Sequence, residues 1–440
     1  MIKIYESKSA SQTILRRIPL DDLPIPVSIQ QGILDLFGEP LSPQQVVDRI
    51  LTDVRLNGDR AVKAWSARLD GSTVDNLHVN PAEVQAALSQ VSQVQIDALK
   101  LSIERVRKFH EKQPLTSWIT QSLGGTLGQV IRPIERIGLY IPAGTAPLPS
   151  SLIMSAVPAQ VAGVPEIVLV APPNRQTGKI APIILATAAL LGLSEIYILG
   201  GAQAIAAIAY GTETIRKVDK IFGPGNLFVT LAKRQVYGLT GIDSLAGPTE
   251  TVVIADDTAN PAWVAADLLA QAEHDMLAAA ILLTPSRPLA VAVQAEVARQ
   301  IQERTRRGIM EISLTNRSGI VITRDLDEAV SLANQYAPEH LCLAVKDPWS
   351  LSEKVTAAGG IFIGEHSFEV LGDYIAGPSH VMPTGGSARF ASPLNVLDFI
   401  HIISLVALDP ATTRAIAPSA TTLALAEGLD AHAYAAQVRL

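Results

Sequence analysis

Side chains suited to proton transfer and metal binding gather in the second half of the chain. Gln271 and His274 stand three residues apart, near the end of an apolar run that begins after Asn260 and Pro261. In a helix this spacing places both side chains on one face, where they could bind one ion together. The alternative is a solvated helix end at which the helix dipole favours a histidine.

Glu339 and His340 form an adjacent acid and base. They follow Pro338, which ends a helical pattern, and they open a short apolar strand. In a regular strand their side chains would point in opposite directions. Such a pair can divide acid/base work, with one group activating water and the other taking the proton of an alcohol. The alternative is an ordinary polar pair at a strand edge.

Other candidates are less distinctive when taken alone. Asp373 and His380 lie within a glycine-punctuated stretch, 372–386, where a loop can present ligands, although Asp is also a common turn residue. His432 stands close to the end of the sequence and alone resembles a surface residue. Cys342 could be a thiol nucleophile, but it shares a strand face with His340 in an apolar segment, so we expect an inert core residue.

The composition limits the classes of function. A chain of 440 residues exceeds what one core usually organises, so two α/β domains are expected. A net charge of -7 without a dense Lys/Arg run argues against nucleic acid or an anionic membrane as the main partner. No apolar stretch reaches the roughly 20 residues of a membrane span. A small-molecule substrate is therefore expected.

The single cysteine and the N-terminal sequence bear on the compartment. One cysteine excludes an intrachain disulfide framework and a Cys-based zinc site, and it fits a reducing compartment. Residues 1–8 have neither the apolar region of a signal peptide nor an Arg/Ser-rich amphipathic pattern. We therefore expect a cytoplasmic protein.

Strand and helix patterns alternate along most of the chain, which is typical of parallel sheets covered by helices. Ser42 and Pro43 are expected to start a scaffold helix as N-cap and first helical residue. One series has strands at 137–141, 167–171, 196–199 and 220–222, with helices near 182–191 and 202–210. A second has strands at 251–255, 279–284, 319–323 and 341–345, with helices near 261–275, 289–303 and 327–336. We therefore predict an α/β fold of two Rossmann-like lobes with parallel-rich sheets.

Two glycine-rich loops, 200–203 and 223–226, fall just past strand ends of the first series, where open parallel sheets bind ligands. Neither loop contains the Gly-x-Gly-x-x-Gly fingerprint, so the motif evidence for a dinucleotide is weak. The residues alone indicate a two-lobed α/β enzyme with a His/Asp/Gln metal site beside a Glu/His acid/base pair.

At these residues the chain resembles the histidinol dehydrogenases. The similarity follows several long motifs in the same order, and it covers about 131–399 together with the terminal helix. The motifs are 138–150, 218–226, 246–250, 271–275, 336–341 and 377–386. The resemblance implies the last steps of histidine biosynthesis, in which L-histidinol is oxidised to L-histidine through an aldehyde while two NAD molecules are reduced, with zinc bound.

The resemblance also implies roles for individual residues. His340 would take the hydroxyl proton, and Glu339 would activate the water that hydrates the aldehyde. Zinc would be held by a set of O and N donors, Gln271, His274, Asp373 and His432. The substrate would contact Thr249, Gln271, His274, Glu339, His340, Asp373, His380, Glu427 and His432. NAD would contact Tyr140, Gln203 and Asn226.

The family resemblance further implies a homodimer whose C-terminal tails reach the partner's site, so that Glu427 and His432 complete the neighbour's metal and substrate shell. We expect tail helices in 1–40, a larger lobe formed by 41–138 with 251–388, a second lobe formed by 139–250, and an exchanged tail at 389–440. Three positions depart from the family's pattern, namely Ala143, Thr249 and His401.

Two other classes of protein could use the same features. A metal-dependent hydrolase on a similar α/β frame would turn over without a nicotinamide. A non-catalytic two-lobed solute-binding protein would close its lobes on a ligand, although the sequence lacks the signal-peptide pattern of the periplasmic kind.

Overall fold

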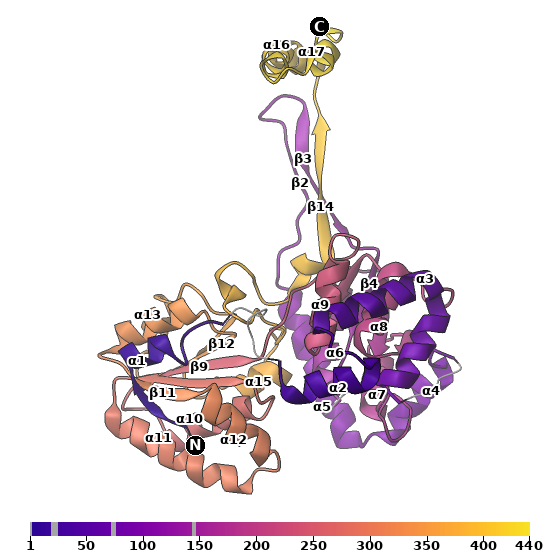
Figure 1. The fold of residues 1–440 in the computed structure, drawn as a ribbon. Coiled ribbons are helices and arrows are strands. Elements are labelled where there is room, and N and C mark those ends of the chain that lie inside the picture. The colour runs from indigo at the N-terminus through magenta and orange to yellow at the C-terminus, as the bar shows by residue number, and fades with distance from the viewer. Residues whose placement is uncertain (1, 19–24, 72–75, 143–146) are drawn as a thin grey trace.

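The computed structural model describes residues 2–18, 25–71, 76–142 and 147–440. It shows two α/β lobes and a long arm that carries the last helices away from both (Figure 1). Each lobe is built on a parallel sheet, so the predicted fold class is confirmed. No helix within the described ranges is both long and apolar enough to cross a membrane.

The first lobe surrounds a six-stranded sheet in which all strands are parallel. Successive residues of its strands point to opposite faces, so Val252 and Val253 enter different cores. In order across the sheet the strands are β1 (Ile4–Glu6), β11 (Gly319–Ile322), β10 (Ala279–Thr284), β9 (Glu250–Ala255), β12 (His340–Ala344) and β13 (Gly360–Ile363). One face is covered by α10 (Pro261–Ala272), α11 (Arg287–Gln300) and α12 (Arg307–Asn316). The other is covered by α1 (Ser7–Gln12), α13 (Leu326–Tyr336) and α14 (Pro348–Ser352), and α15 (Glu369–Tyr374) follows β13.

The second lobe surrounds a five-stranded parallel sheet. In order its strands are β6 (Glu195–Ile198), β5 (Glu166–Ala171), β4 (Arg136–Tyr140), β7 (Lys220–Phe222) and β8 (Gly241–Ile242). One face packs on α4 (Pro81–Ala86), α5 (Gln93–His110), α6 (Pro149–Ala162) and α7 (Pro182–Leu190). The opposite face packs on α2 (Val27–Phe37), α3 (Pro43–Leu69), α8 (Gly201–Tyr210) and α9 (Leu227–Val236).

The arm is an antiparallel sheet that sequence analysis did not foresee. Its long strand β14 (Ile400–Ala407) pairs over its full length with β3 (Thr126–Pro133), and β2 (Trp118–Thr120) pairs with the other side of β3. Beyond the arm lie α16 (Pro410–Ala426) and α17 (Asp430–Gln437), which pack on each other at the far tip (Figure 1). The C-terminal helices therefore lie away from the lobes of their own chain.

The expected division of the chain into lobes differs from the observed one. The capped helix α3 does begin at Ser42 with Pro43 at its first position. Its apolar face packs on α8 and α9, however, so the helices of 41–110 belong to the five-stranded lobe and not with 251–388. Within 1–40, β1 and α1 join the six-stranded lobe, whereas α2 joins the other. Periodicity identified the helices but could not show which sheet they cover.

A stacked pair of phenylalanines anchors the base of the arm. The rings of Phe222 and Phe399 lie 4.3 Å apart at an interplanar angle of 21°, and both side chains are fully buried. We predict that Phe399→Ala lowers the stability of this lobe by about 3–5 kcal/mol, because it removes a large buried ring and leaves a cavity. Urea denaturation followed by circular dichroism measures the shift in midpoint. Phe390→Ala is the control, because that side chain is 86% exposed, and equal midpoints for the two variants would contradict the packing argument.

Candidate active site

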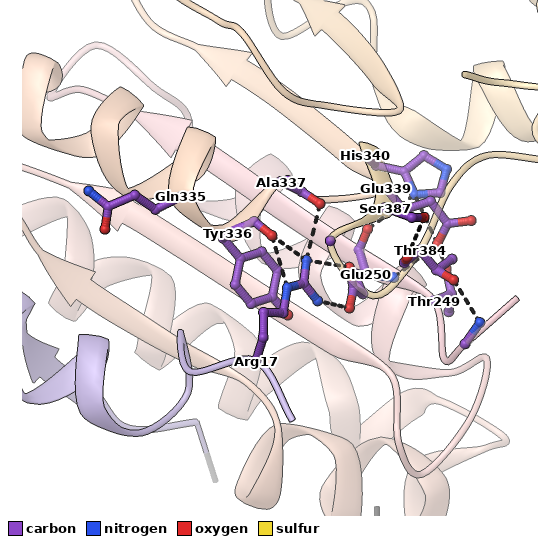
Figure 2. Close-up of polar contacts among 12 residues, drawn as sticks. Arg17, Thr249, Glu250, Gln335, Tyr336, Ala337, Glu339, His340, Thr384 and Ser387 are labelled. Carbon is purple, nitrogen blue, oxygen red and sulfur yellow. Dashed lines mark hydrogen bonds and ion pairs between the residues drawn. The ribbon is translucent and has the colours of Figure 1, made fainter. Parts of the chain in front are cut away.

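The acid/base pair lies at the amino edge of the six-stranded sheet, where β9 and β12 begin side by side. In the register of these strands His340 is opposite Thr251. The preceding Glu339 accepts hydrogen bonds from the Thr249 hydroxyl at 2.5 Å and from the Glu250 amide at 3.0 Å (Figure 2). Parallel pairing of two strands that are distant in sequence therefore brings the carboxylate and the imidazole together.

Burial and neighbouring charge shift the proton affinities of this pair. Burial raises the pKa of Glu339 to about 7, although His340 and the Thr249 hydroxyl oppose the shift. Burial by itself would lower the pKa of His340, but the carboxylates of Glu369, Glu339 and Asp373 outweigh it and raise the pKa to about 10. Glu339 is thus a base that can change protonation near neutral pH.

Glu369 is a member of this cluster that sequence analysis missed. It starts α15, is 1% exposed, accepts a hydrogen bond from Thr251, and has Oε1 3.9 Å from Nδ1 of His340. Burial raises its pKa to about 7, opposed first by His340. Its position four residues before Asp373, on the same face of a short helix, was the signal that could have identified it.

Three of the four expected metal-binding side chains lie in this region. Gln271 ends α10 fully buried, and neither its amide oxygen nor its amide nitrogen has a hydrogen-bond partner. His274 follows it at the exposed end of the helix, and the Asp373 charge acts on its ring. Asp373 Oδ1 lies 3.5 Å from Nε2 of His340. A buried amide without a partner is costly, so these donors fit a bound cation or polar ligand.

The fourth expected ligand lies elsewhere. His432 and Glu427 are exposed on the helices at the tip of the arm, and the structure does not bring them to the site of their own chain (Figure 1). Across the described parts of the chain, no group of three or more His, Cys, Asp and Glu side chains is arranged to hold a metal ion. One chain therefore supplies Gln271, His274 and Asp373 without His432.

His380 connects the site to the second lobe. Its Nδ1 is 2.7 Å from the carbonyl oxygen of Asp373, and its Nε2 is 3.2 Å from the hydroxyl of Ser151 at the start of α6. The neighbouring Ser379 hydroxyl donates to the Met154 carbonyl of the same helix. Desolvation lowers the pKa of His380, although Asp373 opposes the shift. The ring is therefore neutral at physiological pH and is held between the two lobes.

The residues expected to contact NAD lie at the carboxyl edge of the five-stranded sheet. Tyr140 ends β4, is buried, and its hydroxyl accepts from the Gly201 amide at 3.2 Å. Gln203 is fully buried and donates to Asp70 at 3.1 Å, while its Oε1 lacks a partner. Asn226 caps α9 through two backbone amides. All three residues therefore lie at or just past the carboxyl ends of strands, where open parallel sheets commonly bind ligands.

Asp70 is a second residue that sequence analysis missed. Burial raises its pKa to about 6, opposed first by the hydrogen bond from Gln203. It comes from the end of α3, a helix far from the glycine-rich loop in the sequence, so no local pattern indicated it. Ala143, one of the three positions that depart from the family's pattern, lies outside the described residues.

Cys342 behaves as the core residue that was expected. It is 5% exposed in the middle of β12, and burial raises the pKa of its thiol, with Glu369 adding to the shift. A thiol held protonated in an apolar sheet is a poor nucleophile. Cys342 is therefore not a candidate nucleophile.

Comparisons with known proteins identify the family of the chain. The model of the histidinol dehydrogenase family matches residues 40–440. The chain is 54% identical over 420 residues to the histidinol dehydrogenase of Deinococcus radiodurans, covering 95% of each, and 51% identical over 397 residues to that of Heliobacterium mobile, covering 90% of this chain and 93% of the relative. The chain belongs to the histidinol dehydrogenase family.

A solved structure supports the same assignment. The crystal structure of histidinol dehydrogenase from Elizabethkingia anophelis superposes with a TM-score of 0.90 at 36% identity and covers 100% of this chain and 98% of that chain. The protein is therefore an oxidoreductase of histidine biosynthesis, as the sequence motifs predicted. This family membership argues against the hydrolase and the solute-binding protein.

Proposed function

We propose that the enzyme oxidises L-histidinol to L-histidine through the aldehyde and passes two hydrides to two NAD molecules in turn. The observation that carries this proposal is a buried carboxylate with a pKa near 7 next to an imidazole, in a member of this family. One acid/base group is needed to take the alcohol proton, and another to activate water for the second oxidation. Glu339 and His340 supply both.

In the first step His340 accepts the hydroxyl proton as hydride leaves the carbinol carbon for NAD. Its high pKa arises partly from Asp373, whose charge a bound cation would share, so the neutral form becomes more accessible in the loaded site. In the second step Glu339 takes a proton from the water that adds to the aldehyde. The resulting hydrate gives up its hydride to a second NAD and becomes the carboxylate. Thr249 holds the Glu339 carboxylate during this step.

We propose that zinc is held by Gln271, His274 and Asp373, with His432 supplied by a second copy of the chain. The orphaned amide of Gln271 supports this assignment, and the mixed O and N donor set suits zinc and its transition-metal relatives. When bound, the ion would anchor the imidazole and amine of the substrate. His380 is placed to contact the opposite, carboxylate-forming end, while Tyr140, Gln203 and Asn226 would contact NAD.

The homodimer is proposed from the arm. Its long strand and terminal helices expose many large apolar side chains, which an isolated chain would leave in water. They include Ile402, Ile403, Val406, Leu423, Leu425 and Tyr434. A second copy is the natural occupant, because the same arm carries Glu427 and His432, which their own site lacks. His401, on β14 opposite Arg132, has no role that the structure assigns.

The activity itself is tested with purified protein, L-histidinol, NAD and zinc. We expect two NADH for each histidine formed, measured as absorbance of the nicotinamide and as histidine by chromatography. A metal-dependent hydrolase would instead form product when NAD is left out. Absence of any NADH with zinc present refutes the proposed function.

The two steps should depend differently on Glu339. Glu339→Gln should keep zinc and the first hydride transfer while slowing oxidation of the aldehyde by about 10²-fold or more, because the attacking water loses the group that takes its proton.

The rate of aldehyde oxidation should also depend on pH. In the unaltered enzyme this rate should rise with pH through about 7, since only ionised Glu339 can accept a proton. Thr249→Val should move this acid limb to higher pH and Thr249→Ser should not, because the hydroxyl lowers the pKa of Glu339. Stopped-flow measurement of NADH separates the two steps. A pH dependence of aldehyde oxidation that is unchanged in Thr249→Val would argue against Glu339 as the base.

The fourth zinc ligand should come from the partner. His432→Ala should lower zinc content, measured by atomic emission, whereas His401→Ala is a matched control because it removes an exposed histidine from the same arm. His432→Ala and His340→Ala subunits can also be mixed, dissociated and allowed to reassociate. The mixture should regain up to roughly a quarter of the activity, because about half of the dimers are hybrids and each hybrid contains one intact site of two. Failure of the mixture to regain activity would favour a site built within one chain.

A further inference from the structure

An arginine from the N-terminal segment is bound directly behind the acid/base pair. Arg17 follows α1, and its half-buried guanidinium forms a two-pronged ion pair with the buried carboxylate of Glu250. The same group donates to the carbonyl of Tyr336 at 2.9 Å and to that of Ala337 at 3.1 Å, and lies 3.6 Å above the Tyr336 ring (Figure 2). No role suggested by the sequence motifs involves this residue.

The contacts of Arg17 join the two strands that hold Glu339. Glu250 begins β9, and its amide donates to the Glu339 carboxylate while its carbonyl lies 3.3 Å from Nδ1 of His340. Tyr336 and Ala337 end α13, two or three residues before Glu339. Arg17 thus holds the start of β9 through the Glu250 side chain. It holds the residues that lead into β12 through the carbonyls of Tyr336 and Ala337.

The turn that Arg17 caps is one that needs support. Ala337 has a φ of 50°, the only positive value among the non-glycine residues in the described part of the chain. The left-handed conformation is unfavourable for a residue with a side chain and persists where surrounding contacts impose it. The carbonyls of Tyr336 and Ala337 are oriented toward the guanidinium, whose planar fork can satisfy carboxylate and carbonyl oxygens together.

We propose that Arg17 is a positioning residue for Glu339, which holds the carboxylate where it can activate water during aldehyde oxidation. This inference rests on the proposed function. His340 is also held by the pairing of β12 with β13, a strand that Arg17 does not contact. Loss of Arg17 therefore affects the second oxidation more than the first.

Charge provides a second route for the same effect. The charged groups that face Glu339 are His340 and Glu250, and Glu250 in turn faces Arg17 and Arg317. With Arg17 removed, the charge of Glu250 would no longer be balanced by its main ion pair, and wherever Glu250 is ionised that charge would raise the pKa of Glu339. The acid limb of aldehyde oxidation would then move to higher pH.

The test compares Arg17→Met and Arg17→Lys with Arg136→Met. Arg136 is an equally suitable buried arginine, because it holds Glu166 and Glu195 at the amino edge of the other sheet. Each variant is prepared as the zinc-loaded full chain, and its two hydride transfers are measured separately, with L-histidinol and with the aldehyde as substrate. Zinc content and the KM for L-histidinol are measured alongside.

We expect Arg17→Met to lower kcat for the aldehyde by about tenfold or more while the first transfer changes by less than about threefold. In Arg17→Met the rate of aldehyde oxidation should rise with pH only at a higher pH than in the unaltered enzyme. The double variant Arg17→Met/Glu250→Gln should return this rise toward its original pH. Arg17→Lys should be intermediate, since one ammonium cannot replace the fork, and it remains informative if Arg17→Met does not fold. Arg136→Met should leave the ratio of the two rates unchanged.

Two results overturn the proposal. One is an equal loss of both transfers in the Arg17 variants, which would mean a structural role only, and the other is an unchanged ratio together with an unchanged acid limb. These outcomes are distinct from failure of the proposed function, because in that case the unaltered enzyme would itself produce no NADH from either substrate.

Discussion

The parallel pairing of β9 with β12 is the constraint on which the site depends. It places the Glu250 backbone beside Glu339 and His340, which follow it in the sequence by 89 and 90 positions. Because the pairing is central in a sheet covered on both faces, the carboxylate that enters at its edge loses most of its water. Desolvation, more than any single partner, then raises the pKa of Glu339 toward neutrality. The same burial that stabilises the sheet therefore allows the Glu339 carboxyl group to change protonation near neutral pH.

The sequence predicted most elements because buried parallel strands are short apolar runs and their helices carry clear periodicity. Expected strands such as 279–284 and 220–222 coincide with β10 and β7. The arm was not predicted, since β14 combines exposed apolar residues in a pattern that does not distinguish a paired strand from a tail. The grouping of lobes also failed, because an amphipathic helix shows that it has a partner face without showing which sheet that face covers.

The candidate site was predictable where chemistry lies within a motif, and it was missed where chemistry is assembled by long-range packing. Glu339, His340, Gln271 and Asp373 were named from the sequence, and the structure brings them into one region. Arg17 and Asp70 were not, because each reaches its partners from a distant helix or segment. The candidate residues lie at opposite edges of the two sheets, Glu339 at the amino edge of one and the loop near Gln203 at the carboxyl edge of the other. The rule that ligands bind past the carboxyl ends of strands could therefore have located only the second group.

The arm makes assembly part of the proposed chemistry. A single chain presents an amide, an imidazole and a carboxylate at its site, while its remaining imidazole, His432, is carried away on exposed helices. If a second copy supplies that ligand, zinc affinity and dimer affinity are linked, because each binding event stabilises the arrangement that the other needs. In that arrangement the apolar surface of the arm would favour pairing even without metal, and the metal would then favour the correct position of the tail. An unassembled chain would bind the ion less firmly, because it would lack the fourth ligand.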